Sequence, residues 1–197
     1  MITGDEVSVQ VGNKIFLITD KDAPIPKMIC ISNLEIRGYN SIITTKTAPP
    51  NQRGFPSIAN FNDECIFFGG GVDSTNDYLT SVDFYMIESN TWSSAPDMIQ
   101  ARSGFSFCAQ GEKLYAMFGK NPGGITNTIE SLNVRKLLYG DQANWCTFSL
   151  ALGYIHDRLE ALVAPISRNQ IAILGGKSYD NYDLSEVIIL NTQTREA

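Results

Sequence analysis

Short runs of alternating apolar and polar residues, as in EVSVQV at 6–11, and short continuous apolar runs, as in KIFLIT at 14–19, recur along most of the chain. Alternation with a period of two predicts β-strands with one buried face. Turn-forming pairs such as Gly12-Asn13 and Asn62-Asp63 separate neighbouring runs and predict tight hairpins. The expected strands are 6–11, 14–19, 27–33, 41–46, 54–61, 65–69, 81–87, 91–95, 103–109, 113–118, 128–134, 145–150, 159–166, 170–175 and 185–190. The pattern therefore predicts an all-β protein.

A set of markers recurs along the chain about every fifty residues. Gly69, Gly119 and Gly175 lie 50 and 56 residues apart. The arginines that keep nearly the same period, with spacings of 49 and 56 residues, are Arg53, Arg102 and Arg158. Each arginine precedes its glycine by 16 or 17 residues, so the two markers stay in register. A period of this size indicates a repeat architecture.

One unit carries the complete set of markers. It has the double glycine Gly69-Gly70 at the end of a strand, then Tyr85, then Trp92, then Arg102 at the start of the next unit. This order resembles the kelch repeat. The following unit keeps Gly119, Trp145 and Arg158 but has Lys120 in place of the second glycine, and the first unit is degenerate. The resemblance covers nearly the whole chain.

The kelch resemblance implies a single β-propeller domain whose blades span about 5–50, 51–98, 99–154 and 155–197. The last blade holds three expected strands and lacks its outer one. Since kelch propellers usually close with six blades and sometimes with seven, we expect this chain not to form a closed ring alone. We expect it to be part of a longer polypeptide, or to be completed by a partner that covers its exposed edges. The alternative is a strained four-bladed ring.

The repeated residues have physical roles on this fold. Glycine tolerates positive φ and lets two backbones approach closely. Trp92 and Trp145 would fill the space between blades. The arginines could bridge backbone carbonyl groups or face a ligand, and the sequence leaves both readings open. We expect Trp92→Ala to cost about 3–5 kcal/mol of stability, which is more than any single loop Arg→Ala should cost.

Composition fits one all-β domain of 197 residues with 43% hydrophobic residues, ten Phe and eight Tyr. The net charge of −6 argues against nucleic acid or an anionic membrane as the main partner. No apolar run is long enough to span a membrane, and the first residues lack a signal-peptide core.

The four cysteines, Cys30, Cys65, Cys108 and Cys146, are not closely paired in the sequence. We expect reduced thiols and an intracellular, cytoplasmic protein, with the cytoskeleton as one candidate setting.

The search for catalytic chemistry gives little. The chain has a single histidine, His156, and no Cys-x2-Cys or His-Glu-x2-His motif, so we expect no metal. Copper oxidases that share the kelch fold need several histidine ligands. The glycine-rich segments 67–77 and 120–127 do not lead into a helix, so they are not phosphate loops. We therefore expect no cofactor and no enzymatic activity.

The resemblance implies that binding occurs on the connecting loops. Those between the second and third strands (70–80, 120–127 and 177–184) and those between units (47–53, 96–102 and 151–158) should share one face. The residues expected to bind a partner there are Arg53, Asp73, Ser74, Tyr78, Arg102, Lys120, Asn121, Arg158, Lys177, Tyr179, Asp180 and Tyr182. Tyr and Arg often dominate interface energies.

The function expected from this reading is a non-catalytic protein–protein interaction module, as a scaffold or adaptor subunit of a larger assembly. Adaptors of cullin ubiquitin ligases place a helical BTB domain before the propeller, and the chain shows no such segment. The alternative is an enzyme of the sugar-isomerase kind, because some sialate epimerases use kelch propellers with Arg and Glu in the central channel. That alternative requires a closed ring with a polar pocket.

Overall fold

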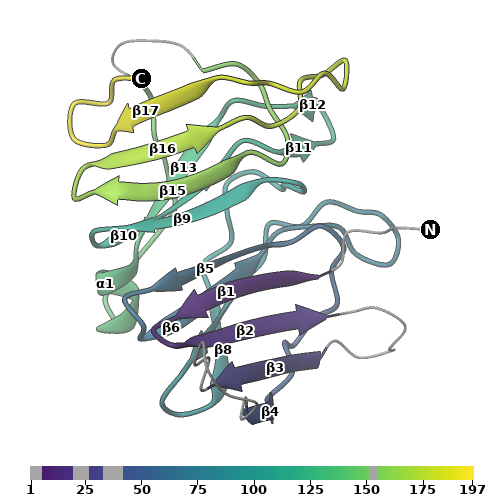
Figure 1. Ribbon diagram of the computed structural model, residues 1–197, viewed down its shortest axis with the longest axis vertical. Coiled ribbons are helices and arrows are strands. Elements are labelled where there is room, and N and C mark those ends of the chain that lie inside the picture. The colour runs from purple at the N-terminus through teal and green to yellow at the C-terminus, as the bar shows by residue number, and fades with distance from the viewer. Residues whose placement is uncertain (1–5, 20–26, 33–41, 151–154) are drawn as a thin grey trace, which may run out of the picture.

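The computed structural model describes residues 6–19, 27–32, 42–150 and 155–197. The protein is nearly all β, with four small antiparallel sheets arranged like the blades of a four-bladed β-propeller. Figure 1 shows the sheets following one another in chain order, from the purple N-terminal sheet to the yellow C-terminal sheet. The all-β propeller fold predicted from the sequence is confirmed.

Each sheet is a simple meander. The first contains β1 (Val7–Val11), β2 (Lys14–Thr19), β3 (Lys27–Ser32) and β4 (Ile42–Lys46). The second contains β5 (Ser57–Phe61), β6 (Cys65–Gly69), β7 (Val82–Met86) and β8 (Thr91–Ala95). The third contains β9 (Ser106–Gln110), β10 (Lys113–Met117), β13 (Ile129–Asn133) and β14 (Cys146–Thr147). The fourth contains β15 (Leu162–Ser167), β16 (Gln170–Leu174) and β17 (Val187–Asn191).

The innermost strands of neighbouring sheets lie side by side in the order β1, β5, β9 and β15. Backbone hydrogen bonds connect them, since Gly104 N donates to Phe55 O at 3.2 Å and Glu160 N donates to Gly104 O at 2.8 Å. Within the described residues, no comparable contact joins β1 to β15. The blades therefore pack in sequence order, each against the one before it.

The inner strands begin about three residues later than the sequence pattern predicts. The expected starts at 54, 103 and 159 are replaced by starts at 57, 106 and 162. The reason is backbone conformation, because Phe55, Gly104 and Glu160 have φ of 51°, 57° and 53°. A left-handed residue interrupts the extended conformation that a strand requires.

A short helix, α1 (Val134–Leu138), stands where the pattern predicts the end of a strand and the start of a longer connection. The side chain of Asn133 caps it by accepting a hydrogen bond from Lys136 N at 2.9 Å. Val134 is fully buried against the apolar cluster that also contains Leu114 and Trp145. The helix thus fixes the segment between β13 and β14, and the strand expected over 145–150 is shortened to two residues.

Three apolar clusters fill the spaces between adjacent sheets. Between the first and second sheets the cluster includes Phe16, Ile18, Met28, Ile66 and Phe68. Between the second and third it includes Phe67, Val82, Phe84, Phe107 and Trp145. Between the third and fourth it includes Tyr115, Met117, Ile129, Ile171 and Ile173. Side chains on opposite faces of one sheet thus contribute to two different interfaces, as the period-two alternation requires.

Both tryptophans link one blade to the connection that precedes it. The indole Nε1 of Trp92 donates to Thr47 O at 2.8 Å, and that of Trp145 donates to Pro96 O at 2.8 Å. The ring of Trp145 also stacks on Phe107, with 6.1 Å between centroids. The repeated tryptophan therefore packs within the fold and satisfies its single donor there.

Gly70 allows the second and third blades to approach closely. Its φ is 60°, and a Cβ atom at this position would lie 2.3 Å from the Phe105 ring. The next residue, Gly71, donates its backbone N–H to Arg102 O at 2.6 Å. The double glycine is therefore needed both for the turn and for contact with the next blade.

Candidate functional site

The three repeated arginines lie inside the protein. Their exposed fractions are 2% for Arg53, 0% for Arg102 and 0% for Arg158. They enter from the connections that precede the inner strands, and a left-handed residue follows two positions after each. The chain turns at this left-handed residue and continues into the inner strand, and the arginine side chain lies buried beneath the loops.

Arg102 shows what these side chains do. Its Nη1 donates to Phe118 O at 2.7 Å and to Thr128 O at 3.0 Å. Its Nη2 donates to the Glu130 carboxylate at 2.7 Å. Glu130 in turn accepts the backbone N–H groups of Ile99 and Gln100, at 2.7 and 3.0 Å. One buried ion pair thus joins the end of β10, the start of β13 and the connection that enters the blade.

The other two arginines repeat this geometry. Arg53 donates to Ser81 O and to the Asp83 carboxylate, both at 2.8 Å. Arg158 donates to Gly175 O at 2.9 Å and forms an ion pair with Glu186. Burial lowers the pKa of Arg53, an effect that the Asp83 charge opposes.

Each arginine is thus paired with an acidic residue of the third strand or just before it, 28 to 30 positions further along the chain. Sequence reasoning missed these partners, which are Asp83, Glu130 and Glu186. These acidic residues lie 47 and 56 positions apart, close to the 50 and 56 of the glycines, and this regularity could have identified them.

Three of the residues expected to contact a partner, Arg53, Arg102 and Arg158, are thus buried beneath the loops. Their Nη donors bind carbonyl and carboxylate groups of the protein itself, whereas the buried Nε of Arg53 and that of Arg102 have no hydrogen-bond partner among the described residues. A guanidinium group without exposed surface cannot be reached by another molecule. Of the two readings left open by the sequence, the structure supports carbonyl bridging.

The other nine predicted residues belong to the loops between second and third strands, named here the BC loops (70–80, 120–127 and 177–184). Paired backbone hydrogen bonds anchor each BC loop to the connection before the inner strand. The bonded pairs are Gly54 with Val72, Ser103 with Lys120, and Leu159 with Lys177. Because equivalent residues are bonded in all three blades, the loops leave the sheets with a defined geometry.

The tips of the first and third BC loops have the same turn. Asn76 and Asn181 both adopt the left-handed conformation, with φ of 66° and 61°. In the first loop, Asp73 accepts hydrogen bonds from the backbone N–H groups of Thr75 and Asp77, at 2.8 and 3.0 Å. Hydrogen bonding to Thr75 and Asp77 lowers the pKa of Asp73. Asp73 therefore shapes the turn.

The second BC loop is a small hairpin formed by β11 (Lys120–Asn121) and β12 (Gly124–Ile125). The side chain of Asn121 accepts a hydrogen bond from Gly123 N at 2.8 Å, which tightens the turn. Lys120 is exposed, and the hairpin projects between the first and third BC loops. By its pairing with Ser103, Lys120 is equivalent to Val72 and Lys177, so the residue that replaces a glycine of the pair in this unit is Phe118, with φ of 65°.

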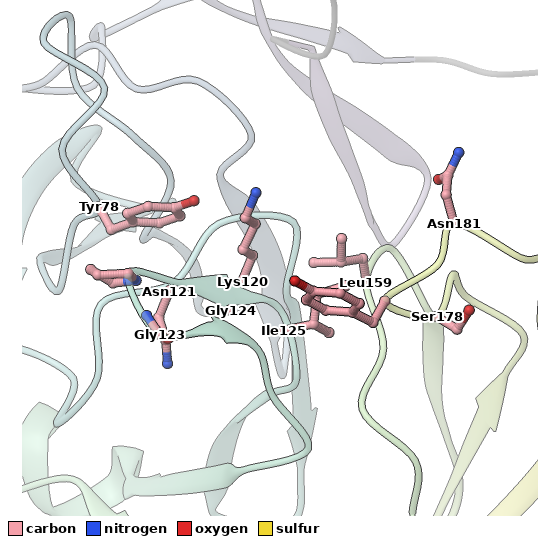
Figure 2. A pocket seen from close by; sticks show the side chains of 11 residues that line it. Tyr78, Lys120, Asn121, Gly123, Gly124, Ile125, Leu159, Ser178 and Asn181 are labelled. Atoms are coloured by element: carbon pink, nitrogen blue, oxygen red, sulfur yellow. Dashed lines mark hydrogen bonds between the residues drawn. The ribbon is translucent and has the colours of Figure 1, made fainter.

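A cleft of about 590 Å³ lies between the BC loops. Figure 2 shows Lys120 between Tyr78 on one side and Ser178 and Asn181 on the other. Four of the predicted residues line it, and they are Tyr78, Lys120, Asn121 and Tyr179. The lining residues that sequence reasoning missed are Pro122, Gly123, Gly124, Ile125, Leu159, Ser178 and Asn181.

Five predicted residues lie outside the cleft lining, namely Asp73, Ser74, Lys177, Asp180 and Tyr182. Tyr182 remains largely exposed on the same loop as Tyr179. The amine of Lys177 lies 3.7 Å from the Glu160 carboxylate. A second cavity of about 320 Å³ shares Tyr78, Lys120 and Leu159 with the cleft and continues toward the inner strands.

The cleft is lined mainly by neutral groups. Lys120 is the cationic group of its lining, and phenol, amide, hydroxyl and glycine backbone groups make up most of the rest.

In residues 6–19, 27–32, 42–150 and 155–197, no group of three or more His, Cys, Asp or Glu could hold a metal ion. Over the same residues, no helix is both long and apolar enough to cross a membrane.

The loops between units contribute less to this face. Met98 is buried, and Thr47 and Pro96 use their carbonyl groups to bind the tryptophans. His156 is exposed, and its carbonyl oxygen accepts a hydrogen bond from Arg158 Nε at 3.2 Å. Positions 151–154 of the third loop lie outside the described residues.

Comparison with known proteins places the chain in no family. No family model and no curated protein matches it.

Proposed function

We propose that this protein is a kelch-type, non-catalytic protein-binding module that acts as a scaffold or adaptor subunit of a larger assembly. The surface used is the cleft between the BC loops. The observation that carries the proposal is the pair Tyr179 and Tyr182, which are 78% and 72% exposed on a backbone-anchored loop. Large aromatic side chains held in solvent on a rigid scaffold suit a protein interface, because little conformational entropy is lost when they bind.

The kelch assignment rests on the repeated ion pair as well as on the sequence markers. In three consecutive blades, an arginine before the inner strand reaches the carbonyl groups at the ends of the second and third strands. This shared role explains why the arginine recurs with the glycines. The repeated contact between arginine and backbone carbonyl groups therefore supports a repeat architecture without reference to the kelch resemblance of the sequence.

The isomerase alternative is supported less well. It requires Arg and Glu side chains that face a pocket, and the repeated arginines are buried in pairs with Asp83, Glu130 and Glu186. The cleft lining contains Lys120 but neither Arg nor Glu. All four cysteines are free, which supports the further proposal of a reducing, intracellular environment.

Selection from a random peptide library on the immobilised protein tests the proposal. Peptides that bind should lose affinity by about 30-fold or more with Tyr179→Ala, as a dominant interface residue would require. Tyr139→Ala is the matched control, because Tyr139 is 76% exposed but lies at the end of α1. Equal affinities for the two variants would contradict the proposal.

A further inference from the structure

The outward face of the fourth sheet is apolar and exposed. Leu162 pairs with Leu174 and Leu174 pairs with Val187, so the three side chains form one row across the sheet. Ala164, Ala172 and Ile189 form the next row on the same face. Leu162 and Val187 are 66% and 63% exposed. Ile171 and Ile173, on the opposite face, are fully buried against the third sheet.

The same positions are buried in the preceding blades. Val82 occupies the position of Val187 in the second sheet, since each opens its strand opposite the last residue of the second strand. Ile129 occupies it in the third sheet. These two side chains are 1% and 2% exposed because the following blade covers them. The fourth sheet therefore presents the face that a following blade covers elsewhere in the protein.

The first sheet presents the opposite half of such an interface. Ile15 pairs with Ile31, which pairs with Ile43, and these residues form an apolar row on the face turned away from the second sheet. Leu17 and Ile29 continue this face. Phe16 and Ile18, on the other face, are buried against the second sheet. Ile43 is 65% exposed.

One chain thus carries both halves of a blade-to-blade contact, at opposite ends of its series of sheets. Each half continues an interface that the protein already forms three times. The aliphatic rows of these faces, which on the first sheet are flanked by Ser8, Gln10 and Thr45, are unfavourable in water. Between neighbouring blades, Gly104 and Glu160 each donate a backbone hydrogen bond to the left-handed residue at the equivalent position of the preceding blade.

We propose that two copies of this chain associate head to tail, with the fourth sheet of one copy packed on the first sheet of the other. The contact joins the Leu162–Leu174–Val187 face to the Ile15–Ile31–Ile43 face. Such an interface is heterologous, so it gives a closed ring or a longer oligomer according to the angle between copies. It is separate from the cleft between the BC loops.

The test uses variants that block one face each. Val187→Lys places a charge on the fourth-sheet face, and Ile43→Lys places one on the first-sheet face. Ile99→Lys is the control, because Ile99 is also an exposed aliphatic residue, at 55%, but lies in the loop between β8 and β9. All three positions are exposed, so circular dichroism and thermal unfolding should match those of the wild type.

Light scattering coupled to size exclusion should give the wild type and Ile99→Lys a mass of two or more chains. Val187→Lys and Ile43→Lys alone should each be monomeric. An equimolar mixture of these two variants should give twice the mass of one chain, since each supplies the face that the other lacks. A monomeric wild type, unchanged masses for the blocked variants, or a mixture that stays monomeric would overturn the proposal. The wild-type mass decides the matter even if a variant fails to fold.

Discussion

The guanidinium group of Arg102 lies 2.7 Å from the carboxylate of Glu130, and neither side chain has more than 2% of its surface exposed. The carboxylate also accepts two backbone N–H groups, so both charges are compensated inside the protein. A buried charge is tolerated only when its partners are present. This pair and its equivalents in the neighbouring blades hold the loops against the sheets.

Arg102→Ala should destabilise the protein by about 3–5 kcal/mol, because it leaves Glu130 buried without its partner. Trp92→Ala should cost less, since Trp92 is only half-buried. This order reverses the one expected from the sequence. Chemical denaturation compares the midpoints, and a lower midpoint for Trp92→Ala would contradict the account. Arg102→Ala combined with Glu130→Gln should recover part of the loss.

Gly70→Ala should destabilise the fold far more than Gly111→Ala. Both glycines have φ of 60°, so both substitutions share the cost of about 1–2 kcal/mol of a left-handed alanine. Only at Gly70 would the new Cβ meet Phe105 at 2.3 Å and Arg102 O at 2.7 Å, whereas nothing lies within 4 Å at Gly111. Thermal unfolding of the two variants measures the difference. Equal losses would show that the close contact between blades is unimportant.

The period of glycine and arginine predicted the blades because strands, turns and tight contacts each require a residue type at a fixed place in every unit. The acidic partners of the arginines were missed, since Asp83 and Glu130 are distant from them in the sequence and approach only when the third strand pairs with the second. Non-glycine residues with positive φ, such as Phe55 and Glu160, gave no signal at all. The inner strands therefore began later than expected.

The candidate cleft was predicted in part for the same reason. Loop position alone suggested Tyr78, Lys120 and Tyr179, which do line it. Ser178 and Asn181 were missed because the turn that places them depends on the left-handed conformation of Asn181. The placement of loop residues follows from backbone turns that short polar sequences specify only weakly.

Thiol reactivity should separate the cysteines into two groups. Burial raises the pKa of Cys65 and of Cys108 to about 12, while Cys146 is exposed. Since the thiolate is the reactive form, the native protein should show one rapid thiol with a disulfide reagent. Cys30, Cys65 and Cys108 should react only on unfolding. Cys146→Ser should abolish the rapid phase, and a rapid phase that persists in this variant would refute the assignment.

Stability should fall as the pH rises from about 9 toward about 12. In the unfolded chain the thiols of Cys65 and Cys108 ionise near 9, whereas in the folded protein their pKa is about 12. Across this window the folded state binds more protons, so each thiol lowers the free energy of unfolding by up to about 1.4 kcal/mol per pH unit. Burial raises the pKa of Tyr85 and of Tyr115 in the same direction.

Denaturant unfolding at a series of alkaline pH values measures this effect. Replacing both Cys65 and Cys108 with alanine should make the decline shallower, with the remaining slope due to the tyrosines and other groups. A decline as steep as that of the wild type would show that the buried thiols are not its source.

The central claim is that the BC loops form the binding face, and hydrogen exchange of the protein with a selected peptide bound tests it most directly. The account predicts slower exchange at 70–80, 120–127 and 177–184 when the peptide is present, and no change at the outer strands β4 and β8. Anchoring of these loops by the Ser103–Lys120 and Leu159–Lys177 hydrogen bonds keeps their own exchange measurable in the free protein. Protection confined to β17 and the first sheet, with unchanged exchange in the BC loops, would contradict the claim.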